Sequence, residues 1–198
     1  MSIDVVDLRN FYTQHLGVVA RRFVGRGIRQ RFATTRGMRV LGLGYATPYM
    51  GLFREEAERC LAFMPAAQGV VKWPTDRPAL STLVDELELP LPDAEMARIL
   101  LVHALEMAHD PVALLREVWR VLAAGGRLLI VVPIGAAYGH GSIPLHLGMA
   151  VLIHARRSRS CCVKHGSPPR VGQRRCMCRR FRADGFYGPR APGSALGQ

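Results

Sequence analysis

The stretch of residues 89–133 reads LPLPDAEMARILLVHALEMAHDPVALLREVWRVLAAGGRLLIVVP and carries the clearest structural pattern in the chain. Its two apolar runs, ARILLVHAL and RLLIVVP, predict buried strands. Between them, Asp110 predicts the N-cap of a helix and Pro111 its first position. Gly125 and Gly126 are expected to end that helix. Apolar strands that alternate with helices indicate an α/β protein with parallel layering.

The segments before this stretch extend the same pattern. Apolar side chains at helical spacing predict a helix over residues 7–36. Residues 38–43 (MRVLGL) predict a strand, and a helix is expected over 52–63. We expect the end of that helical segment, residues 59–64 (RCLAFM), to form a second strand. Residues 79–86 (ALSTLVDE) predict a third strand.

The first predicted helix is strongly basic. No acidic residue occurs between Arg9 and Arg39. One interpretation is a helix that binds anions or a membrane surface. The other is a basic face that is simply solvated, and we expect this one because Gly25 and Gly27 interrupt the helical pattern. The arginines concerned are Arg21, Arg22, Arg26, Arg29, Arg31 and Arg36.

A loop of small residues follows the first predicted strand. It contains Gly42, Gly44 and Ala46, which would let a ligand approach the backbone closely. A strand followed by such a loop is where nucleotide-like ligands bind in α/β proteins. A turn between a strand and a helix also needs glycine for its geometry alone, so the loop by itself leaves both interpretations open.

Three motifs in residues 89–133 resemble the second half of class I S-adenosylmethionine-dependent methyltransferases. They are LPLPD (89–93), LEMAHDP (105–111) and REVWRVL (116–122), the last followed by Gly-Gly-Arg-Leu. The resemblance extends over residues 11–133. It implies a Rossmann-like three-layer sandwich with a mostly parallel sheet, of which about five strands are native, and S-adenosylmethionine as the cofactor.

The resemblance also implies where the cofactor binds. The small-residue loop takes the place of the family's first motif, an acidic residue after the third strand would lie near the adenine, and the end of the fourth strand would face the methionine end. A histidine at a strand end is also a common packed residue, and Tyr12 is either a pocket-lining side chain or a core aromatic. The sequence identifies no catalytic base. The expected cofactor-binding residues are Gly42, Gly44, Ala46, Asp85, Glu86 and His103.

The first motif departs from the family's pattern of an acid followed by three spaced glycines. Gly42 stands at the acidic position, and Ala46 and Pro48 replace two of the glycines. Met64 and Pro65 stand where an acid usually holds the ribose. These departures favour an alternative function, a non-catalytic methyltransferase-like domain that serves for binding or as a scaffold.

Positive charge is concentrated at the end of the chain. The whole chain has a net charge of +12, of which residues 134–198 contribute +10 and residues 1–133 only +2. Few aromatic residues lie among the arginines of this tail, so we expect a disordered basic tail rather than a nucleic-acid site. The tail cysteines lack the C-x₂₋₄-C pairing of structural zinc sites, so no metal is expected. They are Cys161, Cys162, Cys176 and Cys178.

The tail resembles the family when its codons are read in another frame. Taking the last base of each codon with the first two of the next, residues from Ile134 onward can encode NRRGLWARVDTTPFGHGRPYSRSQI, which looks like the continuation of the same family. We therefore expect one base to be missing near the Pro133 codon. The chain then consists of a methyltransferase-like domain over 1–133 and an out-of-frame, disordered tail over 134–198, and its activity is expected to be impaired.

The chain start and hydropathy bear on location. The first residues, MSIDVVDLRN, contain Asp4 and Asp7 and no long apolar core, so a secretory signal is not expected. No run of about 18 apolar residues predicts a membrane span. We expect a cytoplasmic protein whose methyl acceptor is a small molecule rather than a macromolecule.

Overall fold

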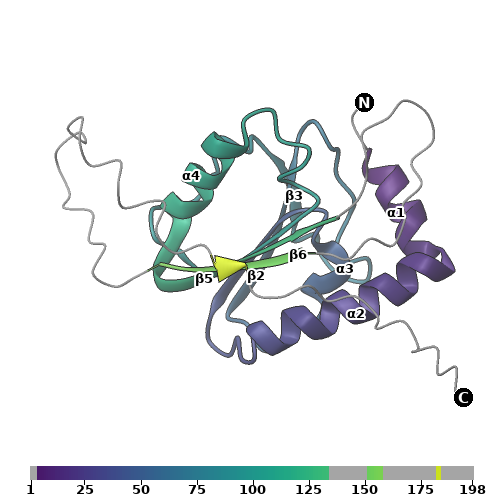
Figure 1. Cartoon of the computed structure of the whole chain (residues 1–198), viewed down its shortest axis with the longest axis horizontal. Coiled ribbons are helices and arrows are strands. Elements are labelled where there is room, and N and C mark those ends of the chain that lie inside the picture. Colours follow the sequence, from purple (N-terminus) through teal and green to yellow (C-terminus); the bar gives the residue numbers. More distant parts are fainter. Residues whose placement is uncertain (1–3, 134–150, 158–181, 184–198) are drawn as a thin grey trace, which may run out of the picture.

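A sheet of seven strands forms the centre of the protein in the computed structural model, which describes residues 4–133, 151–157 and 182–183. The strand order is β3-β2-β1-β4-β5-β6-β7 (Figure 1). The strands are β1 (Arg39–Gly44), β2 (Arg59–Pro65), β3 (Ser81–Val84), β4 (Met96–Val102), β5 (Leu122–Val132), β6 (Val151–Arg156) and β7 (Arg182–Ala183). The first five are all parallel, and β6 runs antiparallel to β5. The predicted α/β fold with a mostly parallel sheet is therefore confirmed.

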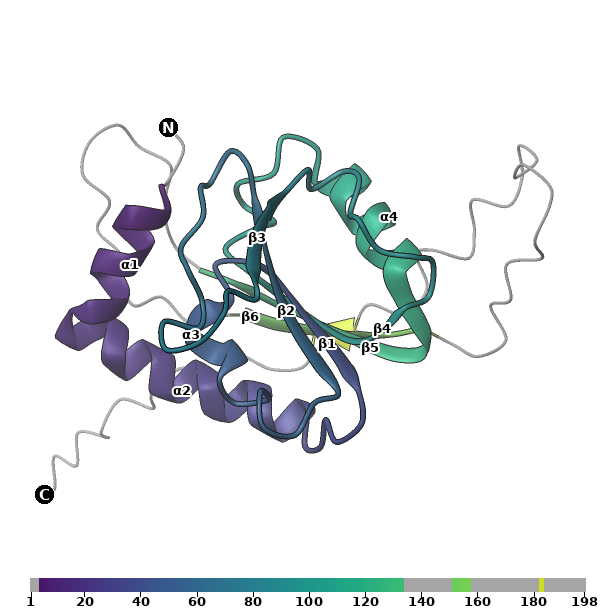
Figure 2. The ribbon, with the colours of Figure 1, turned by 180° about the vertical axis from the view of Figure 1, so that it is seen from behind.

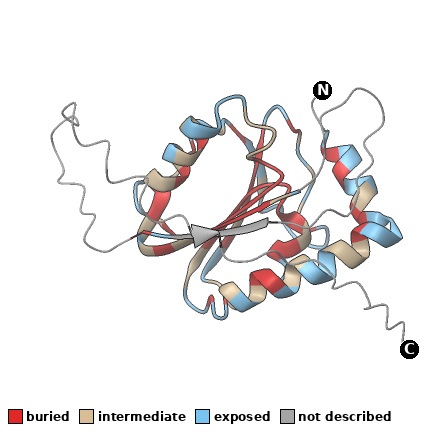
Figure 3. Ribbon diagram, viewed as in Figure 1, coloured by how far each residue is buried: buried red, intermediate tan, exposed pale blue. Residues whose placement is uncertain are grey.

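Helices cover both faces of the sheet, which confirms the three-layer arrangement. α1, α2 and α3 lie on one face and α4 on the other (Figures 1 and 2). The helices are α1 (Val5–Thr13), α2 (His15–Arg31), α3 (Thr47–Met50) and α4 (Pro111–Val121). Successive strand residues alternate between two cores, so that Val40 packs on the α2 side and Leu41 on the α4 side. β1, β2 and β4 are buried along most of their length, whereas α1, α2 and α4 are buried only on their inner faces (Figure 3).

α4 begins where the sequence predicts. The Asp110 carboxylate accepts hydrogen bonds from two backbone N–H groups of the first turn, at 2.9 and 3.0 Å, and Pro111 is the first helical residue. The helix ends earlier than expected, at Val121, and the chain enters β5 at once. Gly125 and Gly126 therefore lie inside β5, where Gly125 has a φ of 80°.

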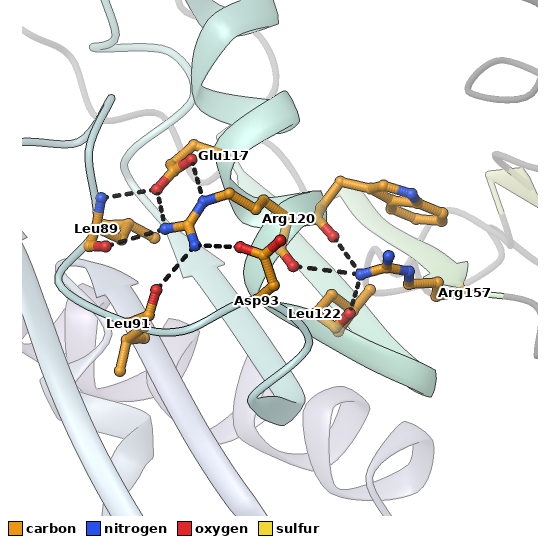
Figure 4. Close-up of polar contacts among 8 residues, drawn as sticks. Leu89, Leu91, Asp93, Glu117, Arg120, Leu122 and Arg157 are labelled. Atoms are coloured by element: carbon orange, nitrogen blue, oxygen red, sulfur yellow. Dashed lines mark hydrogen bonds and ion pairs between the residues drawn. The ribbon is translucent and has the colours of Figure 1, made fainter. Parts of the chain in front are cut away.

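Arg120 ties α4 to the loop before β4 (Figure 4). Its guanidinium donates to the backbone oxygens of Leu89 and Leu91, at 3.0 and 2.9 Å. It also pairs with the Glu117 and Asp93 carboxylates, and Glu117 in turn accepts from the Leu89 N–H at 2.8 Å. These residues belong to the LPLPD and REVWRVL motifs, so the two motifs are joined by one structural network away from the cleft described below.

The region after Pro133 contains regular strands in its described part, which differs from the expectation of an irregular tail. Residues 151–156 read VLIHAR, and their β-branched and apolar content suits a strand. They form β6 and pair with β5. Next to β6, the Arg157 guanidinium donates to the backbone oxygen of Trp119 at 2.8 Å and also to that of Leu122 (Figure 4). Arg157 thus satisfies carbonyl groups at the C-terminal end of α4, as cations commonly do there.

The helix expected over residues 7–36 is in fact two helices. Gln14 has an extended backbone, with φ −75° and ψ 158°, and separates α1 from α2. A Cβ at Gly17 would come within 2.1 Å of the Phe11 oxygen. The second helix therefore starts in a tight corner against the end of the first, which the apolar spacing alone did not reveal.

The helix expected over residues 52–63 is not formed. Residues 51–56 make successive turns, with hydrogen bonds from Phe53 N to Met50 O and from Glu56 N to Phe53 O. The Glu56 carboxylate pairs with Arg29 and accepts from the Thr35 N–H at 3.3 Å. These contacts with the end of α2 replace a helical continuation, and the strand predicted over 59–64 is confirmed as β2.

Candidate functional site

The order of the strands fixes where a ligand would bind. The chain moves from β1 outward through β2 to β3, and then returns to place β4 on the other side of β1. In α/β sheets, ligands bind outside the carboxyl ends of the strands at such a switch of direction. Here that point lies next to Gly44, which is paired with Val102.

A small cleft lies at this edge of the sheet. About 230 Å³ of space free of protein atoms lies within it, and part of this space is open solvent. Its walls come from the last residue of β2 and from the segments that follow β2, β3 and β4. The lining residues are Pro65, Ala67, Gln68, Glu86, His103, Ala104 and Met107.

His103 directly follows β4, and both of its ring nitrogens have hydrogen-bond partners. Nδ1 lies 2.9 Å from the Glu106 Oε1, and Nε2 lies 3.1 Å from the Tyr12 hydroxyl. The backbone oxygen of His103 accepts from the Gln68 amide at 2.9 Å. His103 is buried and has a φ of 51°, which is left-handed backbone that costs a non-glycine residue on the order of 1–3 kcal/mol.

A cluster of three tyrosines meets the His103 ring through Tyr12, whose ring centroid lies 6.0 Å from that of His103. The Tyr49 hydroxyl lies 3.1 Å from the Tyr12 hydroxyl, and the Tyr45 ring lies 5.5 Å from the Tyr12 ring. Burial raises the pKa of Tyr12 well above its usual value and that of Tyr49 to about 12. Both phenols are therefore neutral at physiological pH and act as hydrogen-bond donors.

One assignment of donors and acceptors satisfies all the hydrogen bonds around the His103 ring. A carboxylate can only accept, so Glu106 fixes the proton of a neutral imidazole on Nδ1 and leaves a lone pair on Nε2. The Tyr12 hydroxyl then donates to Nε2, and Tyr49 donates to Tyr12. The chain of groups runs from α3 through α1 to the end of β4.

Two buried acceptor atoms beside the cleft have no protein partner. They are the Gln68 Oε1 and the Glu106 Oε2; the other three buried side-chain atoms without a partner among the described residues are arginine nitrogens. Gln68 is only 3% exposed. An unsatisfied buried polar atom costs on the order of 1–3 kcal/mol. Both atoms therefore suit a ligand that carries hydrogen-bond donors or positive charge.

The small-residue loop lies at the switch of direction, but protein atoms fill the space beside it. A Cβ at Gly42 would come within 2.6 Å of the Met50 sulfur, and one at Gly44 within 2.3 Å of the Val102 oxygen. Ala46 is fully buried. Gly44 also has a φ of 81°, which favours glycine. The packing of β1 against α3 and β4 thus accounts for these small residues without a ligand.

The two acidic candidates after β3 have different surroundings. Asp85 is exposed, and its carboxylate accepts from the Leu87 N–H at 2.8 Å in a local turn. Glu86 lines the cleft, and its partial burial raises its carboxyl pKa. Of the residues named from the sequence, the structure therefore brings Glu86 and His103 together at the cleft.

Sequence reasoning missed Gln68, Glu106 and Met107. Glu106 had a usable signal, because it follows His103 by three residues in the turn after a predicted strand. Gln68 had none, since its role depends on β2 lying near β4. Tyr12 was proposed as either a pocket or a core residue, and it lies in the core with its hydroxyl on His103.

The arrangement can therefore accept a proton at His103 Nε2 and hold donor groups at Gln68 and Glu106. Within residues 4–133, 151–157 and 182–183, no three histidine, cysteine or acidic side chains gather as they would around a metal ion. Over the same part of the chain, no helix has the length and apolar character to span a membrane.

The fold of the chain is similar to that of solved methyltransferases. One is an S-adenosylmethionine-dependent methyltransferase from Aquifex aeolicus, at 16% identity and a TM-score of 0.54, covering 72% of this chain and 80% of that one. Another is a Methanococcus maripaludis protein assigned to the same enzymes, at 15% identity and a TM-score of 0.50, covering 66% of this chain. This chain spans 64% of the length of the Methanococcus protein, just under two thirds.

At such identities, these likenesses establish the fold alone. None of the curated proteins matches the sequence. The sequence pattern of the methyltransferase domain family matches residues 24–130, which is more than half of the 198 residues. The matched region contains β1 to β4, most of β5 and the whole wall of the cleft. The chain belongs to the methyltransferase domain family.

Proposed function

We propose that this protein transfers the methyl group of S-adenosylmethionine to a small-molecule acceptor, with the cofactor in the cleft beyond β2, β3 and β4. The observation that carries the proposal is the pair of unpartnered buried acceptors, Gln68 Oε1 and Glu106 Oε2. S-adenosylmethionine bears a sulfonium, an ammonium, two ribose hydroxyls and an adenine amine. Cationic groups and hydrogen-bond donors of this kind suit the acceptors of the cleft.

The residues present fit the cofactor in chemical character. Glu86 and Gln68 would accept hydrogen bonds from its adenosine part, and His103 would face its methionine part. When bound, the cofactor supplies the reactive methyl group. The protein would supply alignment and exclusion of water, which is its usual share in cofactor chemistry.

The size of the cleft sets a condition on binding. Only about 10 Å³ of it can take the centre of a water-sized sphere, which is roughly room for one water molecule and too little for the cofactor. The segments after β2 and β4, which carry Ala67 and Met107, must therefore move apart for the cofactor to enter.

An alternative function is a non-catalytic domain that serves for binding or as a scaffold. The packing of Gly42 and Gly44 against protein atoms favours it, because these glycines need no ligand to account for them. The departures of the loop from the family pattern point the same way. The two functions differ in one property, which is affinity for the cofactor.

Calorimetric titration of S-adenosylmethionine and of its demethylated product into the 198-residue chain tests the proposal. We expect one site, and we expect Glu86→Gln to weaken binding roughly tenfold, as the loss of one hydrogen bond of about 1.4 kcal/mol would. Glu88→Gln is the matched control, since Glu88 is exposed two residues away. No heat and no thermal shift at millimolar ligand would favour the scaffold.

We further propose that the tail after Pro133 is translated out of frame, that the native domain comprises residues 1–133, and that the activity of this chain is impaired in consequence. The continuous family-like string in the shifted frame supports this proposal. Resequencing the gene across the Pro133 codon in independent clones tests it. An intact frame that retains the tail in every clone would exclude it. The same titration on a frame-restored chain would show how much affinity the native continuation adds.

A further inference from the structure

We propose that His103, held by Glu106, is the base that removes a proton from a hydroxyl acceptor, and that an aromatic alcohol is the acceptor class. The proposal rests on the proposed function, because it concerns the second substrate of the same site. It starts from one juxtaposition: a buried phenol hydroxyl, that of Tyr12, lies 3.1 Å from an imidazole nitrogen that is backed by a carboxylate.

The surroundings of His103 are those of an oriented base. Glu106 Oε1 holds the Nδ1–H at 2.9 Å, which leaves the Nε2 lone pair available. A base whose second nitrogen is fixed by a carboxylate is the arrangement that activates hydroxyl nucleophiles in hydrolases of unrelated folds. His103 also lines the cleft. His103 therefore borders the proposed cofactor position, and its imidazole meets a hydroxyl group.

The backbone of His103 supports a role beyond packing. Its φ of 51° lies in the left-handed region, where histidine is uncommon. The conformation is held by the Gln68 amide, which donates to the His103 oxygen at 2.9 Å. Strained backbone of this kind is found most often at functional sites.

Tyr12 shows which acceptor would fit. Its hydroxyl meets Nε2, and its ring lies between aromatic neighbours. The Tyr45 ring is 5.5 Å away at an interplanar angle of 30°, and the Phe11 and Tyr49 rings are 5.2 and 6.1 Å away, edge to face. The space that Tyr12 occupies is thus suited to a flat ring that carries one hydroxyl group. We infer that an acceptor of this class takes the place of the Tyr12 side chain when α1 moves away.

Movement of α1 away from His103 would break a small set of core contacts. It has nine residues, and only three of them, Val5, Leu8 and Tyr12, are buried. A helix of this length has little stability of its own, so its position depends on those contacts. Displacement of α1 would expose Nε2 to the acceptor while Glu106 keeps the imidazole oriented.

The reaction then balances in one step. With the cofactor bound, the acceptor oxygen would form a bond to the methyl carbon as the bond from that carbon to sulfur breaks, and the electron pair of the broken bond would stay on the sulfur. The hydroxyl proton passes to His103 Nε2. The imidazolium formed is paired with the Glu106 carboxylate and releases its proton to water afterwards.

The first test measures hydroxyl recognition without the cofactor. Tyr12→Ala vacates the ring position, and the probes are 4-methylphenol, which reproduces the lost side chain, and 4-methylanisole, which has no hydroxyl proton. We expect 4-methylphenol to bind roughly five- to tenfold more tightly, which corresponds to one hydrogen bond. His103→Asn should abolish the difference, since asparagine tolerates left-handed backbone but offers no imidazole. Equal binding of the two probes would overturn the proposal.

The second test measures transfer in the Tyr12→Ala protein supplied with S-adenosylmethionine. The acceptors are 4-methylphenol and 4-methylbenzenethiol, whose thiol is ionised at the assay pH and needs no base. We expect His103→Asn to reduce transfer to oxygen by about 10²- to 10⁴-fold and to leave transfer to sulfur within a few-fold. Glu106→Gln, which acts through His103, should give a smaller loss on oxygen only. Equal losses on both acceptors would indicate a structural role and overturn the proposal.

The tests separate this proposal from the proposed function. Absence of cofactor binding in the calorimetric titration would refute the methyltransferase function, whereas the 4-methylphenol preference is measured without the cofactor. If the Tyr12→Ala protein does not fold, Tyr12→Val keeps more of the apolar packing between α1 and the core. The binding of 4-methylphenol and 4-methylanisole is then measured on that variant. The full 198-residue chain is used throughout.

Discussion

The Arg120 guanidinium donates to the Asp93 carboxylate at 2.7 Å, across 27 residues of sequence, and so fastens α4 to the loop before β4. Two backbone oxygens, those of Leu89 and Leu91, depend on the same side chain. Arg120 is thus the centre of a network that holds the loop in place. Its substitution should lower the free energy of unfolding.

We expect Arg120→Met to lower the free energy of unfolding by about 3 kcal/mol, because it leaves the Glu117 carboxylate and two carbonyl oxygens without their partner. Urea denaturation measures the change. Arg116→Met is the matched control, since Arg116 is exposed on the same helix and should change stability by less than about 0.5 kcal/mol. Equal effects of the two substitutions would contradict the role of Arg120.

Glu117 should make stability depend on pH. Hydrogen bonding to Arg120 lowers the pKa of Glu117 in the folded protein. The carboxylate therefore stabilises the fold above its unfolded pKa of about 4.3, and this contribution is lost as the pH falls through the folded value. We expect Glu117→Gln to be less stable than the parent at pH 7, with the gap narrowing below pH 4. A gap that stays constant between pH 7 and pH 3 in urea titrations would argue against this; the exposed Glu55→Gln serves as the control.

Gly44 should be required for the fold itself. A Cβ there would lie 2.3 Å from the Val102 oxygen, and the φ of 81° disfavours other residues. We expect Gly44→Ala to cost at least 2 kcal/mol of stability, by the combined steric and backbone strain (roughly 1–3 kcal/mol for the backbone alone). Gly51→Ala is the control, because nothing lies within 4 Å of its Cβ and its φ of −58° suits alanine. A fully stable Gly44→Ala protein in thermal melts would mean that the β1–β4 junction is looser than described.

The Tyr12 hydroxyl should couple energetically to His103. We expect Tyr12→Phe to destabilise the protein by about 1–2 kcal/mol, since it leaves the hydrogen-bonding groups of Tyr49 and His103 unsatisfied. The same change in a His103→Asn protein should cost less, and the difference between the two gives the coupling, about 1 kcal/mol. Additive effects in this double-mutant cycle would show that the 3.1 Å contact contributes nothing.

An element of this fold can be predicted from the sequence when the residues that determine it lie next to one another in the chain. The β4–α4–β5 unit is predictable because Asp110 and Pro111 set the start of the helix directly after them, and each of the two apolar runs itself forms a strand. The helix expected over residues 52–63 fails because the Glu56 carboxylate, which suits a helix start, is used by Arg29 and Thr35 instead. Contacts between residues that are far apart in the sequence cannot be predicted from any short sequence pattern.

The same reasoning explains the site. Glu86 and His103 could be named because each follows a recognisable strand. The contact between Tyr12 and His103 joins residues 91 apart, and that between Gln68 and His103 joins residues 35 apart. Only the folded sheet brings them together. The role of the small-residue loop stays open in the sequence, because glycines that permit close packing look the same there as glycines that admit a ligand.

The pairing of β6 with β5, closed by Arg157 on the end of α4, has a consequence for the time course of synthesis. In the sequence, Arg157 is the 25th residue after Val132. At about 5–20 residues per second, a ribosome needs roughly 1 to 5 s to make residues 133–157. During that interval, the apolar β5 has one edge without a partner, which is when a nascent chain is most open to pairing with another. Aggregation during expression should therefore increase when residues 133–157 are translated slowly, and it should decrease when a chaperone binds the nascent chain.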